Sequence, residues 1–145
     1  MLVNRMKELK FISPLAVVLP RKTKKDKTIY LNLNVYRNLH YIINNQTKEL
    51  YDEVMGDQLV GLKLKAPLSL LFVFYKKQNR RTDRSNTLSI VEKFFCDALV
   101  KHGCIDDDND EMITSTHYFS GGIDKDNPRV EVFILPEIDL QGFKK

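Results

Sequence analysis

The sequence is poor in cysteine and histidine, and this scarcity argues against several kinds of small protein. It contains two cysteines and three histidines among 145 residues. Cys96 and Cys104 stand eight positions apart, with neither a CxxC pair nor a histidine at zinc-finger spacing. A zinc knuckle and a disulfide framework are therefore disfavoured. We expect both thiols to be reduced, as is usual in the cytoplasm.

The sequence also lacks an apolar run long enough to cross a membrane. The best candidate, FISPLAVVL at residues 11–19, follows a basic stretch but is short and is interrupted by Pro14. No small-residue cleavage site follows it. We interpret it as a core strand, and neither as a signal peptide nor as a membrane span. We expect no membrane partner and a cytoplasmic location.

Length and composition predict one globular domain with a basic surface. A chain of 145 residues with 43% hydrophobic content can bury a substantial core. The formal net charge is +4 and the sequence pI is about 9.0. This balance fits a polyanionic partner, although a lysine-rich surface on an ordinary soluble protein would give the same numbers.

Hydrophobic periodicity in the first half of the chain predicts strands and one helix. Ile29, Leu31 and Leu33 alternate with polar neighbours, which indicates a strand. Residues 41–54 show helical spacing at Leu50 and Val54, and Asn45 is a possible N-cap. The run LSLLFVFY at residues 68–75 is typical of a central strand buried on both faces.

The second half predicts one amphipathic helix and a closing hairpin. Residues 87–102 have a helical apolar stripe, with Ser85 or Asn86 as cap and Gly103 as terminator. Residues 113–119 and 129–135 alternate and are separated by SGGIDKDNP, as in a hairpin. The whole order predicts a single small α+β domain, with a mixed β-sheet and helices packed on one face.

Two segments between these elements are strongly basic. We expect mobile basic loops near residues 20–28 and 76–84, because such segments cannot fold alone. Their Lys and Arg residues attract polyanions; they are Arg21, Lys22, Lys24, Lys25 and Lys27 in the first loop and Lys76, Lys77, Arg80, Arg81 and Arg84 in the second.

One short segment is strongly acidic. GCIDDDND, residues 103–110, has four carboxylates in eight positions of a basic chain. An ordinary solvated turn is one interpretation. An EF-hand loop is excluded, because Glu111 stands where that loop needs glycine and His117 where it needs the closing glutamate.

A metal site is the other interpretation of the acids. Asp83 precedes the predicted helix, whereas Asp107 and Asp108 follow it. Helix length keeps these two ends about 20 Å or more apart, unless a loop folds back along the helix. Three carboxylates within about 5 Å repel one another by a few kcal/mol per pair, so they need a cation between them.

Residues 83–113, DRSNTLSIVEKFFCDALVKHGCIDDDNDEMI, resemble the signature of the RusA family of Holliday-junction resolvases. That pattern is Asp-x-Asp-Asn, a helix carrying Lys and Asp-Ala-Leu, then Gly and paired Asp-Asp. Upstream, LNLNVYRNLHYIINNQTKELYDEV is similar to the family's Asn-x-x-Tyr-Arg segment and first helix. The resemblance covers residues 10–135 approximately.

The resemblance implies a RusA-like fold and a small endonuclease, often encoded by a phage and located in the bacterial host's cytoplasm. Such enzymes act as homodimers and use Mg²⁺, for which Mn²⁺ can substitute, to hydrolyse a phosphodiester in a four-way DNA junction. Asp83, Asp107 and Asp108 match the family's catalytic acids and metal ligands. Lys93 matches its helix lysine, although it stands seven rather than three residues after Asn86.

Ser85 departs from the family pattern, because it occupies the position of the second Asp. The site then has one negative charge fewer, and we expect it to need more Mg²⁺. Ser85 could orient a metal-bound water or cap the helix, and Asn86 could cap the helix or order the acid loop. Lys93 could instead be a surface lysine paired with Asp97 one turn away.

The remaining assignments concern DNA and competing functions. We interpret Asp106 and Asp110 as surface residues, and none of the histidines as catalytic. The alternatives are a catalytically impaired junction-binding protein and a structural or regulatory protein whose acidic loop binds no metal. The residues expected to contact DNA are Lys24, Lys25, Lys76, Lys77, Arg80, Arg81 and Arg84.

Overall fold

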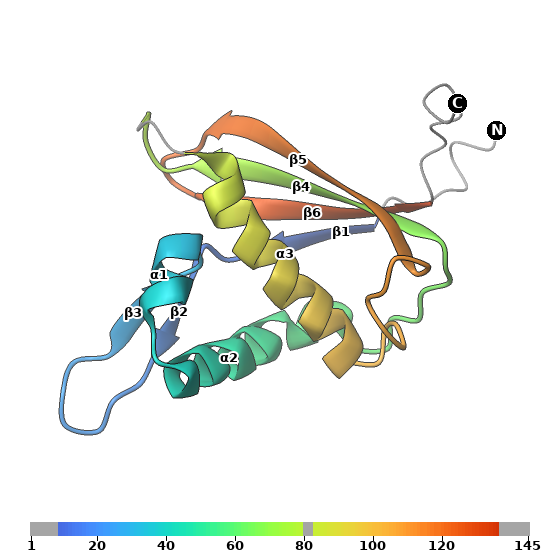
Figure 1. Ribbon diagram of the computed structural model, residues 1–145. Coiled ribbons are helices and arrows are strands. Elements are labelled where there is room, and N and C mark those ends of the chain that lie inside the picture. The colour runs from blue at the N-terminus through green and yellow to red at the C-terminus, as the bar shows by residue number, and fades with distance from the viewer. Residues whose placement is uncertain (1–8, 80–82, 137–145) are drawn as a thin grey trace.

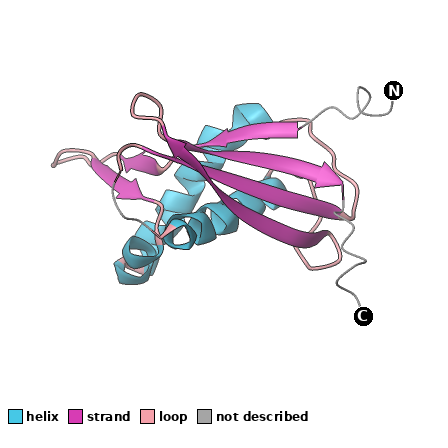
Figure 2. Cartoon of the chain, turned by 90° about the horizontal axis from the view of Figure 1, so that it is seen from above, coloured by secondary structure: helices cyan, strands magenta, loops and turns pink. Residues whose placement is uncertain are grey.

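Helices cover one face of a four-stranded sheet, and the described chain places no helix on the other face (Figures 1 and 2). The computed structural model describes residues 9–79 and 83–136. In chain order the elements are β1 (Leu9–Ser13), β2 (Ala16–Leu19), β3 (Lys27–Tyr30), α1 (Leu33–Asn38), α2 (Tyr41–Leu59), β4 (Leu68–Lys76), α3 (Arg84–Lys101), β5 (Ile113–Ile123) and β6 (Arg129–Pro136).

The sheet is mixed, in the order β1-β6-β4-β5. Strand β4 runs parallel to β5 and antiparallel to β6, and β1 pairs antiparallel with β6. Helix α3 makes the crossover between the parallel strands β4 and β5, as such a pair requires. The predicted class, a small single-domain α+β protein with a mixed sheet and helices on one face, is confirmed.

Strand β4 is central, as predicted, but its two faces differ. Leu70 and Phe72 are fully buried on the helix side. Leu71 and Val73, which point to the opposite side, are half-buried. The prediction of burial on both faces is therefore only half correct, because helices cover a single face of the sheet.

The predicted closing hairpin is wrong. Strands β5 and β6 are consecutive in the chain, but β4 lies between them and pairs with both. The connection turns past the end of β4, where the Asp124 backbone nitrogen donates to the Lys76 carbonyl at 2.8 Å. A long apolar strand with two free edges offers more ladder hydrogen bonds than a hairpin alone, and alternation cannot show which edge a strand takes.

Two predicted strands near the N-terminus are each divided. The run at residues 11–19 breaks at Pro14 into the end of β1 and the separate strand β2. The run that begins at Ile29 stops at Tyr30, because the Asn32 side chain accepts a hydrogen bond from the Val35 backbone nitrogen at 2.9 Å and caps α1. Strands β2 and β3 form a separate two-stranded sheet that carries the first basic loop.

The helices begin at other residues than predicted. Helix α2 is capped by His40 rather than Asn45, and Val54 is exposed while Tyr51 and Met55 face the core. Helix α3 is capped by Asp83 rather than by Ser85 or Asn86. Its predicted end is confirmed, since Gly103 adopts the left-handed conformation with φ 72°. No helix in the described ranges is long and apolar enough to span a membrane.

Candidate active site

Asp83 stands at the N-terminus of α3 and stabilises the start of that helix. Its Oδ1 accepts hydrogen bonds from the Ser85 backbone nitrogen at 3.0 Å and from the Ser85 hydroxyl at 2.7 Å. Both bonds lower the pKa of the Asp83 carboxyl, and the bond from the hydroxyl has the larger effect. Asp83 is fully ionised at neutral pH and exposed to solvent.

Ser85 and Asn86 both support Asp83 rather than cap the helix themselves. The Ser85 hydroxyl is committed to the Asp83 carboxylate, and the Asn86 backbone nitrogen donates to the Asp83 carbonyl at 3.1 Å. The prediction that either residue is the cap is wrong. The reason is local: an aspartate two residues before Ser85 offers the stronger acceptor to the first free N–H groups.

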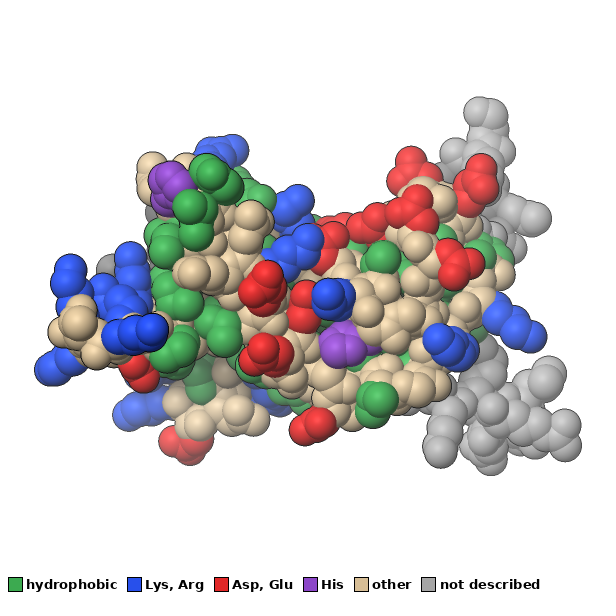
Figure 3. Space-filling view, turned by 90° about the horizontal axis from the view of Figure 1, so that it is seen from below, with side chains coloured by type: hydrophobic (Ala, Val, Ile, Leu, Met, Phe, Trp, Pro, Cys, Tyr) green, Lys and Arg blue, Asp and Glu red, His purple; other side chains and the backbone are tan. Residues whose placement is uncertain are grey.

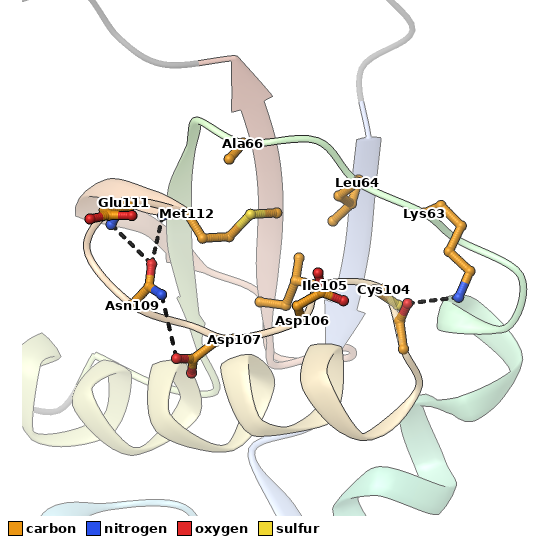
Figure 4. Close-up of a pocket in the computed structure, with 11 residues that line it drawn as sticks. Lys63, Leu64, Ala66, Cys104, Ile105, Asp106, Asp107, Asn109, Glu111 and Met112 are labelled. Atoms are coloured by element: carbon orange, nitrogen blue, oxygen red, sulfur yellow. Dashed lines mark hydrogen bonds between the residues drawn. The ribbon is translucent and has the colours of Figure 1, made fainter.

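The acidic loop, residues 105–112, is a built turn rather than a loose segment. The Asp107 Oδ1 accepts from the Asp108 backbone nitrogen at 2.8 Å. The Asn109 side-chain oxygen accepts from the backbone nitrogens of Glu111 and Met112 at 3.1 and 3.0 Å (Figure 4). Asp107 and Asp108 are both exposed. The loop therefore presents two adjacent carboxylates to solvent on a defined backbone.

A hollow of about 450 Å³ separates this loop from the segment that leads into β4 (Figure 4). Lys63 closes one side, where its Nζ donates to the Gly103 carbonyl at 2.8 Å. Asp106 and Asp107 line the same hollow. Asp106, predicted to be a plain surface residue, is exposed at its edge.

A second hollow of about 560 Å³ lies between α2, α3 and the acidic loop. Asp107 and Asp108 line it together with Asp52 and Asp97. Lys48 of α2 crosses it, with Nζ 2.9 Å from Asp97 Oδ2. The hydrogen bond to Asp97 raises the pKa of Lys48, so this ammonium partly neutralises the acids around it.

The acidic loop folds back part of the way along α3. Asp107 and Asp108 line the same hollow as Asp97, Val100 and Lys101, so they lie beside the C-terminal part of the helix. In the described residues, no three His, Cys, Asp or Glu side chains are grouped so that they could hold a metal ion. The structure therefore does not bring Asp83 together with Asp107 and Asp108.

Lys93 is exposed on α3, and its Nζ lies 5.9 Å from the centre of the Tyr36 ring. The alternative pairing with Asp97 does not form, because Asp97 pairs with Lys48. Tyr36 belongs to α1, whose position next to α3 could not be derived from the spacing of residues in either helix. Lys93 thus remains available to an anion at the surface.

Glu92 is a polar residue of this region that the sequence analysis did not identify. It lies between α3 and β5, where it accepts hydrogen bonds from the Tyr118 hydroxyl and from Thr116 Oγ1. Burial and this carboxylate together raise the pKa of Tyr118. A carboxylate on an amphipathic helix usually faces solvent. The partners of Glu92 follow from the packing of α3 against β5, which the sequence pattern does not show.

The described residues among those predicted to contact DNA lie away from the acidic loop, towards the opposite end of the molecule. Figure 3 shows Lys and Arg gathered over the β2–β3 loop at one end and Asp and Glu gathered towards the other. Lys24, Lys25 and Lys77 are exposed. Arg84 also faces solvent, with NH1 3.5 Å from the Ser120 hydroxyl.

The two remaining arginines, Arg80 and Arg81, lie outside the described residues. Lys76 is half-buried at the end of β4, where its carbonyl accepts from Asp124. The first basic loop is closed by its own contacts: Arg21 donates from Nε to the Lys25 carbonyl at 2.7 Å.

Asp52 leads to a pH-dependent prediction. It is 8% exposed, and its Oδ1 has no hydrogen-bond partner within the described structure. Burial raises its pKa above the ordinary 3.8 despite Lys48 and His102. When folding raises the pKa of a carboxyl group, the protonated group stabilises the fold at pH values below its pKa in the unfolded chain. This stabilisation is lost as the pH rises through its pKa in the folded protein.

We therefore expect Asp52→Asn to be more stable than the native chain at pH 7, with the difference shrinking as pH falls below about 4. Urea unfolding between pH 3 and 8 measures this. Asp57→Asn, an exposed position on the same helix, is the matched control and should change little. A native chain that is the more stable at pH 7 would contradict the prediction.

Neither a model of a known protein family nor a curated protein matches this sequence.

Proposed function

We propose that this protein is a Mg²⁺-dependent, structure-specific endodeoxyribonuclease that resolves four-way junctions and related branched DNA. The observation that supports this most directly is the distribution of charge. Two exposed adjacent carboxylates stand on a hydrogen-bonded loop, and a separate basic end is available for phosphates. The RusA-like order of residues 83–113 supports the choice of branched DNA as the substrate and of the host cytoplasm as the place of action.

The acidic loop supplies ligands of the kind that Mg²⁺ prefers. In phosphoryl-transfer sites this ion often takes only one or two protein carboxylates, and water and substrate oxygens complete its shell. Asp107 and Asp108 fit that requirement. When bound there, the ion would polarise the scissile phosphate and lower the pKa of an attacking water. Asp107 is already oriented by the Asp108 backbone nitrogen.

Asp83 is included in the proposed set by its place in the RusA-like motif. Because most of α3 separates it from Asp108, it reaches the same phosphate only if the acidic loop and the N-terminus of α3 approach each other when DNA binds. Lys93 is proposed to contact the phosphate, where an ammonium offsets charge that develops in the transition state.

The proposed enzyme acts as a homodimer. A four-way junction has two-fold symmetry, and paired nicks need two active sites related by the same axis.

The test is nicking of a synthetic mobile four-way junction by the purified protein, with Mg²⁺ and with EDTA. We expect symmetric nicks that need Mg²⁺ and that Mn²⁺ also supports. Binding without nicking would favour the catalytically impaired junction-binding protein. That second function draws on the finding that Asp83 stands apart from the acidic loop. Absence of both binding and nicking would contradict both functions.

Affinity for DNA is expected to fall steeply with salt. The two basic loops together carry ten Lys and Arg residues. If about six of them contact phosphates, log K against log salt should have a slope of about −5, because each contact releases condensed counterions. Fluorescence anisotropy of a labelled junction between 50 and 300 mM salt measures the slope. A slope shallower than about −2 would show that the loops are not the DNA-binding surface.

A further inference from the structure

A surface cleft of about 410 Å³ lies between β3 and α1, away from the acidic loop. Its apolar floor consists of Ile29, Val35 and Leu39. Ile29 is 2% exposed and belongs to the core, whereas Val35 and Leu39 are half-buried. The cleft is therefore an open hollow with a fixed apolar floor.

The cleft exists because the chain changes from strand to helix within three residues. The Leu31 backbone nitrogen donates to the Leu15 carbonyl at 2.9 Å, which holds the end of β3. Asn32 then caps α1 through the Val35 nitrogen. The helix is thus turned against its own preceding strand, and both walls are held by hydrogen bonds at their junction.

The rim of the cleft carries a flat ring and polar groups. Tyr30 is 59% exposed although it belongs to a strand. Asn34 and Asn38 line the α1 side, and the Asn38 side-chain nitrogen donates to the Asn34 carbonyl at 2.8 Å. An apolar floor, an exposed aromatic ring and side-chain amides are the groups that hold a planar heterocycle and pair with its edges.

The electrostatic surroundings select an anionic ligand. Lys27 lies at the rim, at the point where the β2–β3 loop enters β3. The loop itself adds four basic residues and one acid, Asp26, whose carboxylate accepts from the Arg21 backbone nitrogen. Figure 3 shows hydrophobic side chains bordering this gathering of Lys and Arg. The complementary ligand has a planar apolar part and an adjoining chain of negative charges.

We propose that the β3–α1 cleft binds an unpaired base of single-stranded DNA, with Tyr30 stacking on the base and the β2–β3 loop holding the flanking phosphates. The inference deepens the proposed function, on which it rests for the biological substrate, because base pairs at the branch point of a junction open more readily than those inside a continuous duplex. An apolar peptide would use the floor but has no need of five cations beside it. A base within intact duplex cannot enter, since its faces are stacked.

The test uses a short oligonucleotide with one central 2-aminopurine, a base whose fluorescence reports stacking, and the same sequence as a duplex. Native protein should quench the single strand on stacking with Tyr30. Tyr30→Ala should weaken single-strand binding about tenfold and abolish the quench, because stacking contributes about 1–3 kcal/mol per base. Tyr30→Phe, which keeps the ring, should bind like the native protein.

The matched control is Tyr41→Ala. Tyr41 is 69% exposed, is also a surface tyrosine, and does not line the cleft; its replacement should leave binding unchanged. Equal loss for single strand and duplex in Tyr30→Ala would overturn the inference, because it would indicate general phosphate binding. So would unchanged affinity, or absence of any binding to DNA.

Failure of this inference is distinguishable from failure of the proposed function. Tyr30-dependent quenching without junction nicking would support the base cleft and contradict the nuclease. Nicking by the native protein with a Tyr30→Ala variant that binds single strands normally would contradict the cleft and leave the nuclease intact.

Discussion

Asp108→Asn is expected to lower the rate of junction nicking more than about 100-fold while leaving the fold and junction binding unchanged. Residues that only support metal ligands cost 10–100-fold when they are replaced, so loss of a ligand itself should cost more. The amide keeps the shape of the side chain but removes the anionic oxygen that Mg²⁺ needs. Single-turnover nicking measures the chemical step, and gel shift in the presence of Ca²⁺ measures binding.

Asp110→Asn is the control for this experiment. Asp110 is exposed in the same loop, so its replacement removes the same charge from almost the same place. It should nick at nearly the native rate. Mg²⁺-dependent nicking by Asp108→Asn at the native rate would mean that the acidic loop is not the metal site. An equal loss in both variants would mean that only the general negative charge of the loop matters.

Asp83→Asn is expected to have the second largest effect, a loss of nicking of about 100-fold without loss of stability. Asparagine is as good an N-cap as aspartate, so the contact with the Ser85 backbone nitrogen can be kept. Asp83→Ala should lose nicking to the same extent and also lose about 1 kcal/mol of unfolding free energy, because the cap is gone. Chemical denaturation and nicking assays on the two variants separate the roles.

The results for the two Asp83 variants decide whether Asp83 stays apart from Asp107 and Asp108 during the reaction, as it is in the structure. If both variants lose nicking, Asp83 and the acidic loop must approach each other around the DNA. If Asp83→Asn nicks like the native protein, Asp83 is a helix cap only, and the RusA-like motif is misaligned at its first position.

Strand β4 and helix α3 could be predicted from the sequence because their signals are local. In the run LSLLFVFY only Ser69 is polar, which predicts a buried strand. The stripe of apolar residues at helical spacing after it predicts a helix that packs on the sheet. The predicted caps of α3, Ser85 and Asn86, lie two and three residues after the observed cap Asp83. Such an error is usual where several polar side chains compete for the same N–H groups.

Strand partners could not be predicted from the same patterns. Strands β5 and β6 alternate as clearly as any hairpin, yet they pair on opposite edges of β4. Alternation of apolar and polar residues indicates which face of a strand is buried. It does not indicate which strand pairs along each of its edges. Helix α1 was missed for a different reason: the single hydrogen bond from Val35 to the Asn32 side chain overrides three alternating residues, and the β3–α1 cleft is its consequence.

For the candidate site, the sequence by itself determined which chemical groups exist and their order: a basic loop, Asp83, a helix, then paired acids. Only the tertiary structure decided their distances, because these depend on how far each loop folds back after an element of known length. It sets Lys48 of α2 against Asp97 of α3 and Glu92 against β5, and it leaves Asp83 apart from Asp108. Those contacts join residues remote in the chain, and packing of whole elements, which no local pattern encodes, brings them together.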